Sequence, residues 1–192
     1  MGKLTAAEKR KVQMPLLWIG LASILMTFAG LTSGYIVSRS ALSAENRWLE
    51  FALPQEFLYA TIVIVISSAT MYLAAQSLKK NLISRAGGLT LISLLLGISF
   101  LVLQIKGAQD LVDRGMFFTG GNSASSWVYV IAGLHWLHVV SGIIVLLYTW
   151  YRTAILKVHS ATDHQGFAVS ALYWHFLDAL WLGLYLFLFF YR

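Results

Sequence analysis

Two ionisable side chains lie deep inside the last apolar stretch of the chain. His175 and Asp178 belong to residues 167–191, which are otherwise mostly aliphatic or aromatic. That stretch is long enough to cross a bilayer, since a spanning helix needs about 20 apolar residues. A charged side chain at the centre of such a helix costs at least ~2.5 kcal/mol, so Asp178 is expected to have a partner. Residues three apart share a helix face, which makes His175 the first candidate.

The same face carries aromatic side chains around the acid. Trp174 and Trp181 flank Asp178 at i−4 and i+3, and Tyr173 precedes them. Unpaired polar groups are costly in hydrocarbon, so this face should pack on other helices of this chain or of a partner. The aromatic density of the stretch as a whole is interpreted as mostly lipid-facing and interfacial bulk.

Two further histidines lie in residues 127–150, where His135 and His138 are three apart and share a helix face. Together with His175 they raise a haem hypothesis, because two buried histidines on facing helices can ligate a b-type haem. His138 and His175 would differ in depth by roughly 6 Å at 1.5 Å per residue, which is awkward for one haem. The alternative is that each histidine satisfies a neighbouring hydroxyl, carbonyl or carboxylate, and we favour it. A zinc site is favoured less, because nothing positions His135 beside His175.

Asp178 also has two readings. As a functional group it would relay protons or contact a lipid head group. As a structural group it would hydrogen-bond His175 or a polar side chain of the preceding span, such as Ser141. A proton relay needs a series of groups, so we favour the structural role. We therefore predict no catalytic, cofactor-binding or metal-binding residue, but a structural polar seam between residues 127–150 and 167–191, formed by His135, His138, Tyr173, Trp174, His175, Asp178 and Trp181.

The composition is that of an integral membrane protein. Of the 192 residues, 58% are hydrophobic and 11% are charged, against about 45–50% and about 25% in ordinary soluble domains. Cysteine is absent, which excludes a disulfide framework and a thiolate metal site. The net charge of +6 resides between the apolar stretches, so we interpret it as a topology signal and not as a nucleic-acid footprint.

The pattern predicts an all-α, polytopic bundle of five transmembrane helices in a single domain covering residues 1–192. Pro15 stands where the first helix can begin, and small residues follow that would permit close helix contact. The longest connection, residues 106–126, contains a flexible Gly-Gly-Asn-Ser-Ala-Ser-Ser run. The predicted spans are residues 15–37, 57–78, 86–105, 127–150 and 167–191.

The basic residues are distributed unequally between the two sides of these spans. One side holds nine of them and the other holds five. By the positive-inside rule this places the N-terminus inside and the C-terminus outside.

The last two spans resemble subunit III of the haem–copper terminal oxidases. They read GLHWLHVVSG and then HQGFAVSALYWHFLDALW, similar to that family's Gly-x-His-x-x-His-Val-x-x-Gly helix and its Gly-Phe and Tyr-Trp-His-Phe-x-Asp-x-x-Trp helix. Weaker matches at 28–35, 67–74 and 94–104 extend the resemblance over nearly the whole chain, in the five-helix form typical of bacterial members. The matching positions are Gly133, His135, His138, Val139, Gly142, Gly166, Phe167, Tyr173, Trp174, His175, Phe176, Asp178 and Trp181.

The resemblance implies a cofactor-free accessory subunit of an oxidase in the bacterial inner (cytoplasmic) membrane. Its partners would be the catalytic subunit I, subunit II, a small subunit IV and a possible respiratory supercomplex. Haem and copper would lie in partner subunits, and phospholipid would bind in a cleft between helices. The complex would reduce oxygen to water, with electrons from cytochrome c or quinol, while pumping protons. The three intramembrane histidines become structural groups, with His175 and Asp178 as the bonded pair.

Three carboxylates common in that family are missing. Their places are taken by Ile24, Gly107 and Ala168. Their absence argues against a proton-antenna role for this chain. It suggests a divergent member that serves assembly or contact with a further respiratory complex.

Three other classes stay open. A subunit-III-like protein of a nitric oxide reductase would share these motifs. A haem b membrane anchor of a dehydrogenase would keep haem in the isolated chain. A small transporter would function alone in liposomes, but the few intramembrane charges argue against it.

Overall fold

The described part of the chain consists of helices and their connections, with no strand. The computed structural model describes residues 6–45, 47–48, 50–119, 123–159 and 164–191, and the side chains from residue 12 onward. Each of the five long helices is long and apolar enough to cross a membrane, so the predicted all-α, multi-pass class is confirmed. The elements are α1 (Ala6–Ala44), α2 (Gln55–Lys79), α3 (Ile83–Asp113), α4 (Ser123–Trp150), a π-helical turn η1 (Tyr151–Ile155) that continues α4, and α5 (Gln165–Tyr191).

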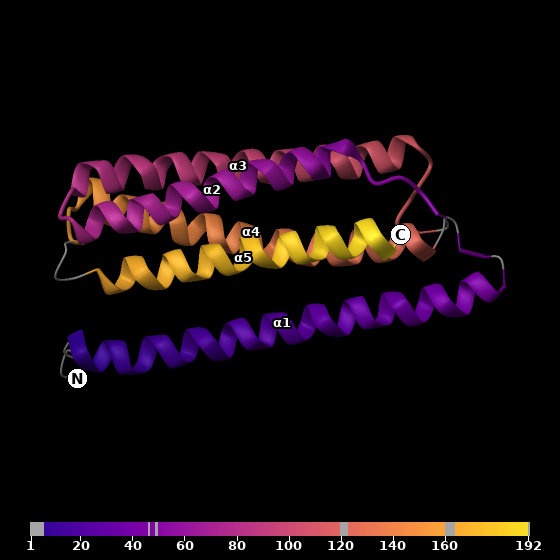
Figure 1. The fold of residues 1–192 in the computed structure, drawn as a ribbon, viewed down its shortest axis with the longest axis horizontal. Helices are drawn as coiled ribbons and strands as arrows, with labels where there is room; N and C mark the ends of the chain where they lie inside the picture. Colours follow the sequence, from indigo (N-terminus) through magenta and orange to yellow (C-terminus); the bar gives the residue numbers. More distant parts are fainter. Residues whose placement is uncertain (1–5, 46, 49, 120–122, 160–163, 192) are drawn as a thin grey trace.

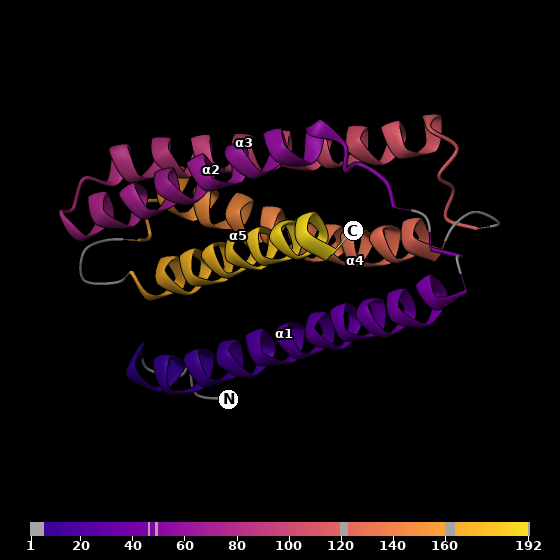
Figure 2. The same cartoon turned by 45° about the vertical axis from the view of Figure 1, so that its right-hand side comes forward.

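The helices form one elongated bundle (Figures 1 and 2). Helices α2 and α3 make an antiparallel pair along one side, α4 and α5 lie beside them, and α1 lies along the opposite side. Within the described residues, α1 packs on α4 and α5 but not on α2 or α3. The first turn of α1 and the last turn of α5 lie at opposite ends (Figure 1). An odd number of spans requires this, while the side on which each end lies stays a prediction.

Helix α1 is the least covered of the five, because most of its side chains face outward. Its small residues were expected to bring helices together, and Gly34 does so. A Cβ at Gly34 would lie 2.7 Å from Cη2 of Trp127 in α4. Ala22, Ser23, Ala29, Gly30 and Ser33 are exposed in this chain, so close contact at these positions, with a partner subunit, stays a prediction.

The helices are longer than the predicted spans. Helix α1 begins before Pro15 and continues to Ala44, so Pro15 lies inside the helix and not at its start. Helix α3 continues past Ile105 to Asp113, where an Asp110–Arg114 ion pair joins its last turns. Hydropathy identifies the residues that lie in the hydrocarbon core of the membrane. A helix can extend beyond that core into the interface, where its residues are polar.

The connections are correspondingly shorter. Residues 106–126 were expected to form the longest connection. The first part of this segment, up to Asp113, belongs to α3, and Ser123–Ser126 belong to α4. Residues 120–122 of its predicted flexible run lie outside the described residues. The turn between α2 and α3 consists of residues 80–82, against residues 79–85 between the predicted spans. Its Asn81 adopts a left-handed conformation with φ 59°, which Asn tolerates better than most residues.

Candidate functional site

Trp174 joins α5 to three other helices. Its Nε1 donates a hydrogen bond of 3.1 Å to Oγ of Ser67 in α2. Its ring lies on Gly97 of α3 and Gly142 of α4, where an added Cβ would come within 2.6 Å and 3.0 Å of ring carbons. Only glycine lets a helix backbone approach an indole so closely. The side chain is 1% exposed, so it belongs to the core.

Trp181 occupies the next layer of the same helix face. Its Nε1 donates a hydrogen bond of 3.0 Å to Oγ1 of Thr61 in α2. Its ring stacks on His135 with a centroid separation of 5.3 Å and meets Phe57 and Phe100 edge-on. Trp174 and Trp181 are therefore core side chains, which confirms the expectation that their helix face packs on other helices. Phe189, Phe190 and Tyr191 are exposed, and their contact with lipid stays a prediction.

His175 and Asp178 do not bond each other. Nδ1 of His175 and the hydroxyl of Ser68 in α2 are hydrogen-bonded at 2.7 Å. Asp178 is buried, and neither carboxyl oxygen has a hydrogen-bond partner among the described residues. The Ser68 hydroxyl lies close to this carboxyl group but does not reach hydrogen-bonding geometry. The predicted His175–Asp178 pair is therefore wrong, because a serine 107 residues earlier in the chain takes the histidine.

His135 is fully buried among aromatic rings. Phe28 of α1, Phe100 of α3 and Trp181 of α5 surround its imidazole. Neither ring nitrogen has a hydrogen-bond partner among the described residues. The expectation that this histidine satisfies a neighbouring polar group is therefore wrong, and it serves as an aromatic surface for Trp181.

His138 turns away from His175. Its Nδ1 donates a hydrogen bond of 2.8 Å to the Leu134 carbonyl one turn earlier, and its ring meets Phe28 of α1 edge-on. His175 instead bonds α2, so these rings face different helices. The described residues contain no group of three or more His, Cys, Asp or Glu side chains suited to a metal ion.

The polar seam lies mainly between α5 and α2. Helices α4 and α5 are joined by Tyr173–Ser141 at 2.6 Å and Thr149–Ser170 at 2.7 Å. Trp174, His175 and Trp181 instead form hydrogen bonds to α2. Their partners there are Ser67, Ser68 and Thr61, respectively. The sequence holds a signal for them, since Thr61 and Ser68 are seven residues apart and share one helix face.

Gly107, one of the three missing carboxylate positions, has a clear steric explanation. A Cβ at Gly107 would lie 2.5 Å from Cε1 of Phe57 in α2, so a glutamate there would displace that buried ring. Ile24 is half-buried and packs against the core. Ala168 is half-buried in the first turn of α5, and nothing in its surroundings explains the loss of the acid.

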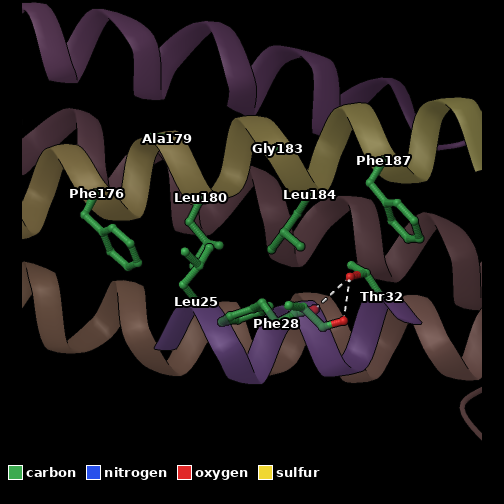
Figure 3. A pocket seen from close by; sticks show the side chains of 10 residues that line it. Leu25, Phe28, Thr32, Phe176, Ala179, Leu180, Gly183, Leu184 and Phe187 are labelled. Atoms are coloured by element: carbon green, nitrogen blue, oxygen red, sulfur yellow. Dashed lines mark hydrogen bonds between the residues drawn. The ribbon is translucent and has the colours of Figure 1, made fainter. Parts of the chain in front are cut away.

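An apolar groove of about 440 Å³ separates α1 from the C-terminal half of α5 (Figure 3). Phe28, Leu180 and Leu184 line its middle, and Ala179 and Gly183 widen it through their small size. Thr32 is the single polar side chain among the lining residues, and its hydroxyl donates to carbonyls of its own helix. The groove is suited to hydrocarbon and offers no charge to a head group.

Comparison with known proteins identifies the family. The family model for cytochrome c oxidase subunit III matches residues 49–192. A probable cytochrome c oxidase subunit 3 of Nocardia farcinica (strain IFM 10152) is 32% identical over 182 residues, covering 91% of this chain and 85% of the relative. The cytochrome c oxidase subunit 3 of Corynebacterium diphtheriae (strain ATCC 700971 / NCTC 13129 / Biotype gravis) is 30% identical, covering 88% and 83%. That of Bacillus sp. (strain PS3) is 30% identical, covering 88% and 80%. The chain, with its five membrane-spanning helices and its Tyr-Trp-His-Phe-x-Asp-x-x-Trp core helix, belongs to the cytochrome c oxidase subunit III family.

Proposed function

We propose that this chain is a cofactor-free accessory subunit of a proton-pumping haem–copper oxidase in the bacterial cytoplasmic membrane. It packs on the catalytic subunit I beside subunit II and takes no part in electron transfer. Cytochrome c, which the relatives' names contain, is the proposed electron donor of the complex.

The observation that carries this proposal is that polar side chains of α5 form hydrogen bonds to another helix of the same chain. Trp174, His175 and Trp181 each bond a hydroxyl of α2. Each of these ring nitrogens forms a hydrogen bond between two helices of the bundle. The side chains therefore hold the helices together and do not act as cofactor ligands.

The small number of buried carboxyl groups supports a non-catalytic role. Asp178 is the one acidic residue that is buried within the spans of the described part of the chain. Proton transfer across a membrane needs a series of acidic or imidazole groups. The apolar residues at 24, 107 and 168 leave no such series on this chain, so proton transfer belongs to the partner subunits.

The groove between α1 and α5 supports phospholipid binding. It lies inside the spans, where the hydrocarbon tails of lipids adjoin the protein, and its lining is apolar. A lipid acyl chain fills such a groove without leaving a polar group unpaired.

A reduced-minus-oxidised visible spectrum tests the cofactor assignment. The tagged oxidase is purified in mild detergent, and its spectrum is recorded before and after the other subunits are stripped from this chain. We expect an a-type haem band in the complex and no haem in the stripped chain. Haem retained by the stripped chain would overturn the proposal, and the His138→Ala and His175→Ala variants would then identify the ligands. The a-type haem band in the complex would favour an oxygen-reducing oxidase over a nitric oxide reductase.

A strain that lacks this chain tests the accessory role. We expect the remaining oxidase to assemble poorly or to lose activity progressively during turnover. An oxidase that assembles and turns over normally without the chain would contradict the proposal.

A further inference from the structure

His175 presents one ring nitrogen to the outside of this chain. Its side chain is half-buried where α5 contacts α2, and its Nδ1 is hydrogen-bonded to the Ser68 hydroxyl at 2.7 Å. The second ring nitrogen, Nε2, has no hydrogen-bond partner among the described residues and is not buried by them. The polar atom that remains on the surface of the bundle at this position is therefore Nε2.

The Ser68 hydroxyl determines which nitrogen of the ring carries the proton. That hydroxyl has one hydrogen to donate, and the Asp178 carboxyl beside it does not reach hydrogen-bonding geometry. Among the described residues, Nδ1 of His175 is the one acceptor to which the hydroxyl is bonded. Nδ1 therefore accepts this bond, and an imidazole that accepts at Nδ1 carries its proton on Nε2. Nε2–H is thus a hydrogen-bond donor on the outer edge of the ring.

This donor lies near the middle of the membrane. Ten residues of α5 precede His175 and sixteen follow it, so at 1.5 Å per residue it lies about 5 Å from the midpoint of the helix. When α5 is centred in a hydrocarbon core ~30 Å thick, the ester oxygens of lipids begin roughly 10 Å away. Lipid tails offer no acceptor at this depth, and an unpaired N–H group in hydrocarbon is costly. We therefore expect the acceptor to come from another protein.

Exposed apolar side chains of the same two helices surround His175. Helices α2 and α5 are neighbours in the bundle (Figure 1), and their outward-facing residues recur at helical spacing beside the Ser68–His175 bond. The other exposed residues do not line the groove between α1 and α5, so this surface is distinct from that groove. We call it the α2–α5 face: Val65, Ser68 and Tyr72 of α2, and His175, Leu182 and Leu186 of α5.

We propose that a membrane-spanning helix of a neighbouring oxidase subunit packs along the α2–α5 face and offers an oxygen acceptor to Nε2–H of His175. The acceptor is a backbone carbonyl, a hydroxyl or a carboxylate, the groups that accept a hydrogen bond from an imidazole N–H. A protein helix can cover the apolar side chains and also pair the donor, whereas a lipid tail can do only the first. The inference rests on the proposed function in that the chain has oxidase subunits as neighbours, and it names the face and the donor that meet one of them.

Photo-crosslinking in the intact oxidase tests which molecule covers the α2–α5 face. A benzophenone amino acid replaces Leu182 in the face or, as a control, Ile98 of α3, which is similarly exposed. The native membranes are irradiated, and the products are identified by mass spectrometry. We expect Leu182 to cross-link to a membrane-spanning segment of another oxidase subunit in higher yield than Ile98. Products with phospholipid alone from Leu182, or equal protein yield from the two positions, would overturn the proposal.

Two variants of His175 separate the outward donor from the bond to Ser68. The amide of asparagine lies about where Nδ1 lies in histidine, and the amide of glutamine lies about where Nε2 lies. His175→Asn therefore keeps a partner for Ser68 and removes the outward donor, while His175→Gln does the reverse. The control is Ser99→Ala, because the Ser99 hydroxyl is exposed on α3 and bonds the Leu95 carbonyl of its own helix.

We expect His175→Asn to bind the rest of the oxidase about threefold more weakly, the effect of one average hydrogen bond between membrane helices. The measurement is the fraction of this subunit that stays in the complex during a detergent titration, followed on native gels. His175→Gln and Ser99→Ala should stay in the complex as the wild type does. Retention of His175→Asn at the wild-type level, or equal loss of the asparagine and glutamine variants, would contradict the proposed donor.

The same preparations separate this inference from the proposed function. Their subunit composition and oxygen turnover are recorded beside the cross-linking. An active oxidase that contains the chain, but in which Leu182 labels only phospholipid, rejects the α2–α5 face alone. A chain that never co-purifies with oxidase subunits rejects the proposed function.

Discussion

Trp174 and Gly142 meet across the α4–α5 interface at a separation that leaves no room for a methyl group. A Cβ on Gly142 would lie 3.0 Å from Cζ3 of Trp174 and 2.7 Å from Cδ1 of Leu177. The second glycine of the Gly-x-His-x-x-His-Val-x-x-Gly motif is therefore required by packing. The first, Gly133, has no atom within 4 Å of its Cβ position and is not explained by packing within this chain.

This contrast gives a matched pair of variants. Gly142→Ala should destabilise the chain by about 1–3 kcal/mol, because the rigid indole cannot yield without moving off Gly97. Gly133→Ala should change stability by less than about 0.5 kcal/mol. The measurement is the thermal unfolding of the purified oxidase, followed through dissociation of this subunit. Equal stability of the two variants would refute the packing account of Gly142.

The Trp181–Thr61 hydrogen bond should be measurable as a coupling energy. The double-mutant cycle of Trp181→Phe and Thr61→Val should give about 0.6 kcal/mol and at most about 1.7 kcal/mol, the range found for hydrogen bonds between membrane helices. The control cycle replaces Thr61→Val by Ser23→Ala, because the Ser23 hydroxyl is exposed and bonds only its own helix. That cycle should be additive within about 0.3–0.5 kcal/mol. Coupling of similar size in both cycles would mean that the bond between α2 and α5 does not contribute.

The sequence predicted the number and order of the spans because long apolar stretches report membrane depth directly. It did not predict where the helices end. Helix α3 reaches Asp113 on residues such as Lys106 and Asp110, which no hydropathy rule assigns to a helix. The π-helical turn at Tyr151–Ile155 follows from no local pattern either.

The sequence predicted which residues of α5 face other helices, but not the residues to which they form hydrogen bonds. Helical spacing places His175, Asp178 and Trp181 on one face, and the structure places that face against other helices. Spacing along one helix cannot show which other helix faces it. The choice of α2 over α4 depends on packing, in which Gly97 and Gly142 admit Trp174 and turn its N–H toward Ser67.

The partner of His175 can be tested without a further structure. The cycle of Ser68→Ala with His175→Leu should show coupling of about 0.6 kcal/mol, as expected for one hydrogen bond between membrane helices. The cycle of His175→Leu with Asp178→Asn should be additive within about 0.3–0.5 kcal/mol, because these side chains share a face without bonding. Both cycles are followed by unfolding of the purified chain in mixed detergent micelles. The reverse pattern, with coupling only between His175 and Asp178, would restore the pair that the sequence suggested.

Filling the α1–α5 groove should displace lipid. Gly183 lines the groove, and its Cβ position has no atom within 4 Å, so Gly183→Leu can be accommodated and would occupy space that an acyl chain otherwise fills. Gly20→Leu is the matched control, since Gly20 is equally open but lies outside the groove. We expect the Gly183→Leu oxidase to retain about one phospholipid fewer per chain than the control, counted by mass spectrometry of the extracted lipids, and to lose activity sooner during turnover, since one apolar groove of this size accommodates one lipid-sized ligand. Equal lipid content in the two variants would mean that the groove is closed by a neighbouring subunit and not by a lipid.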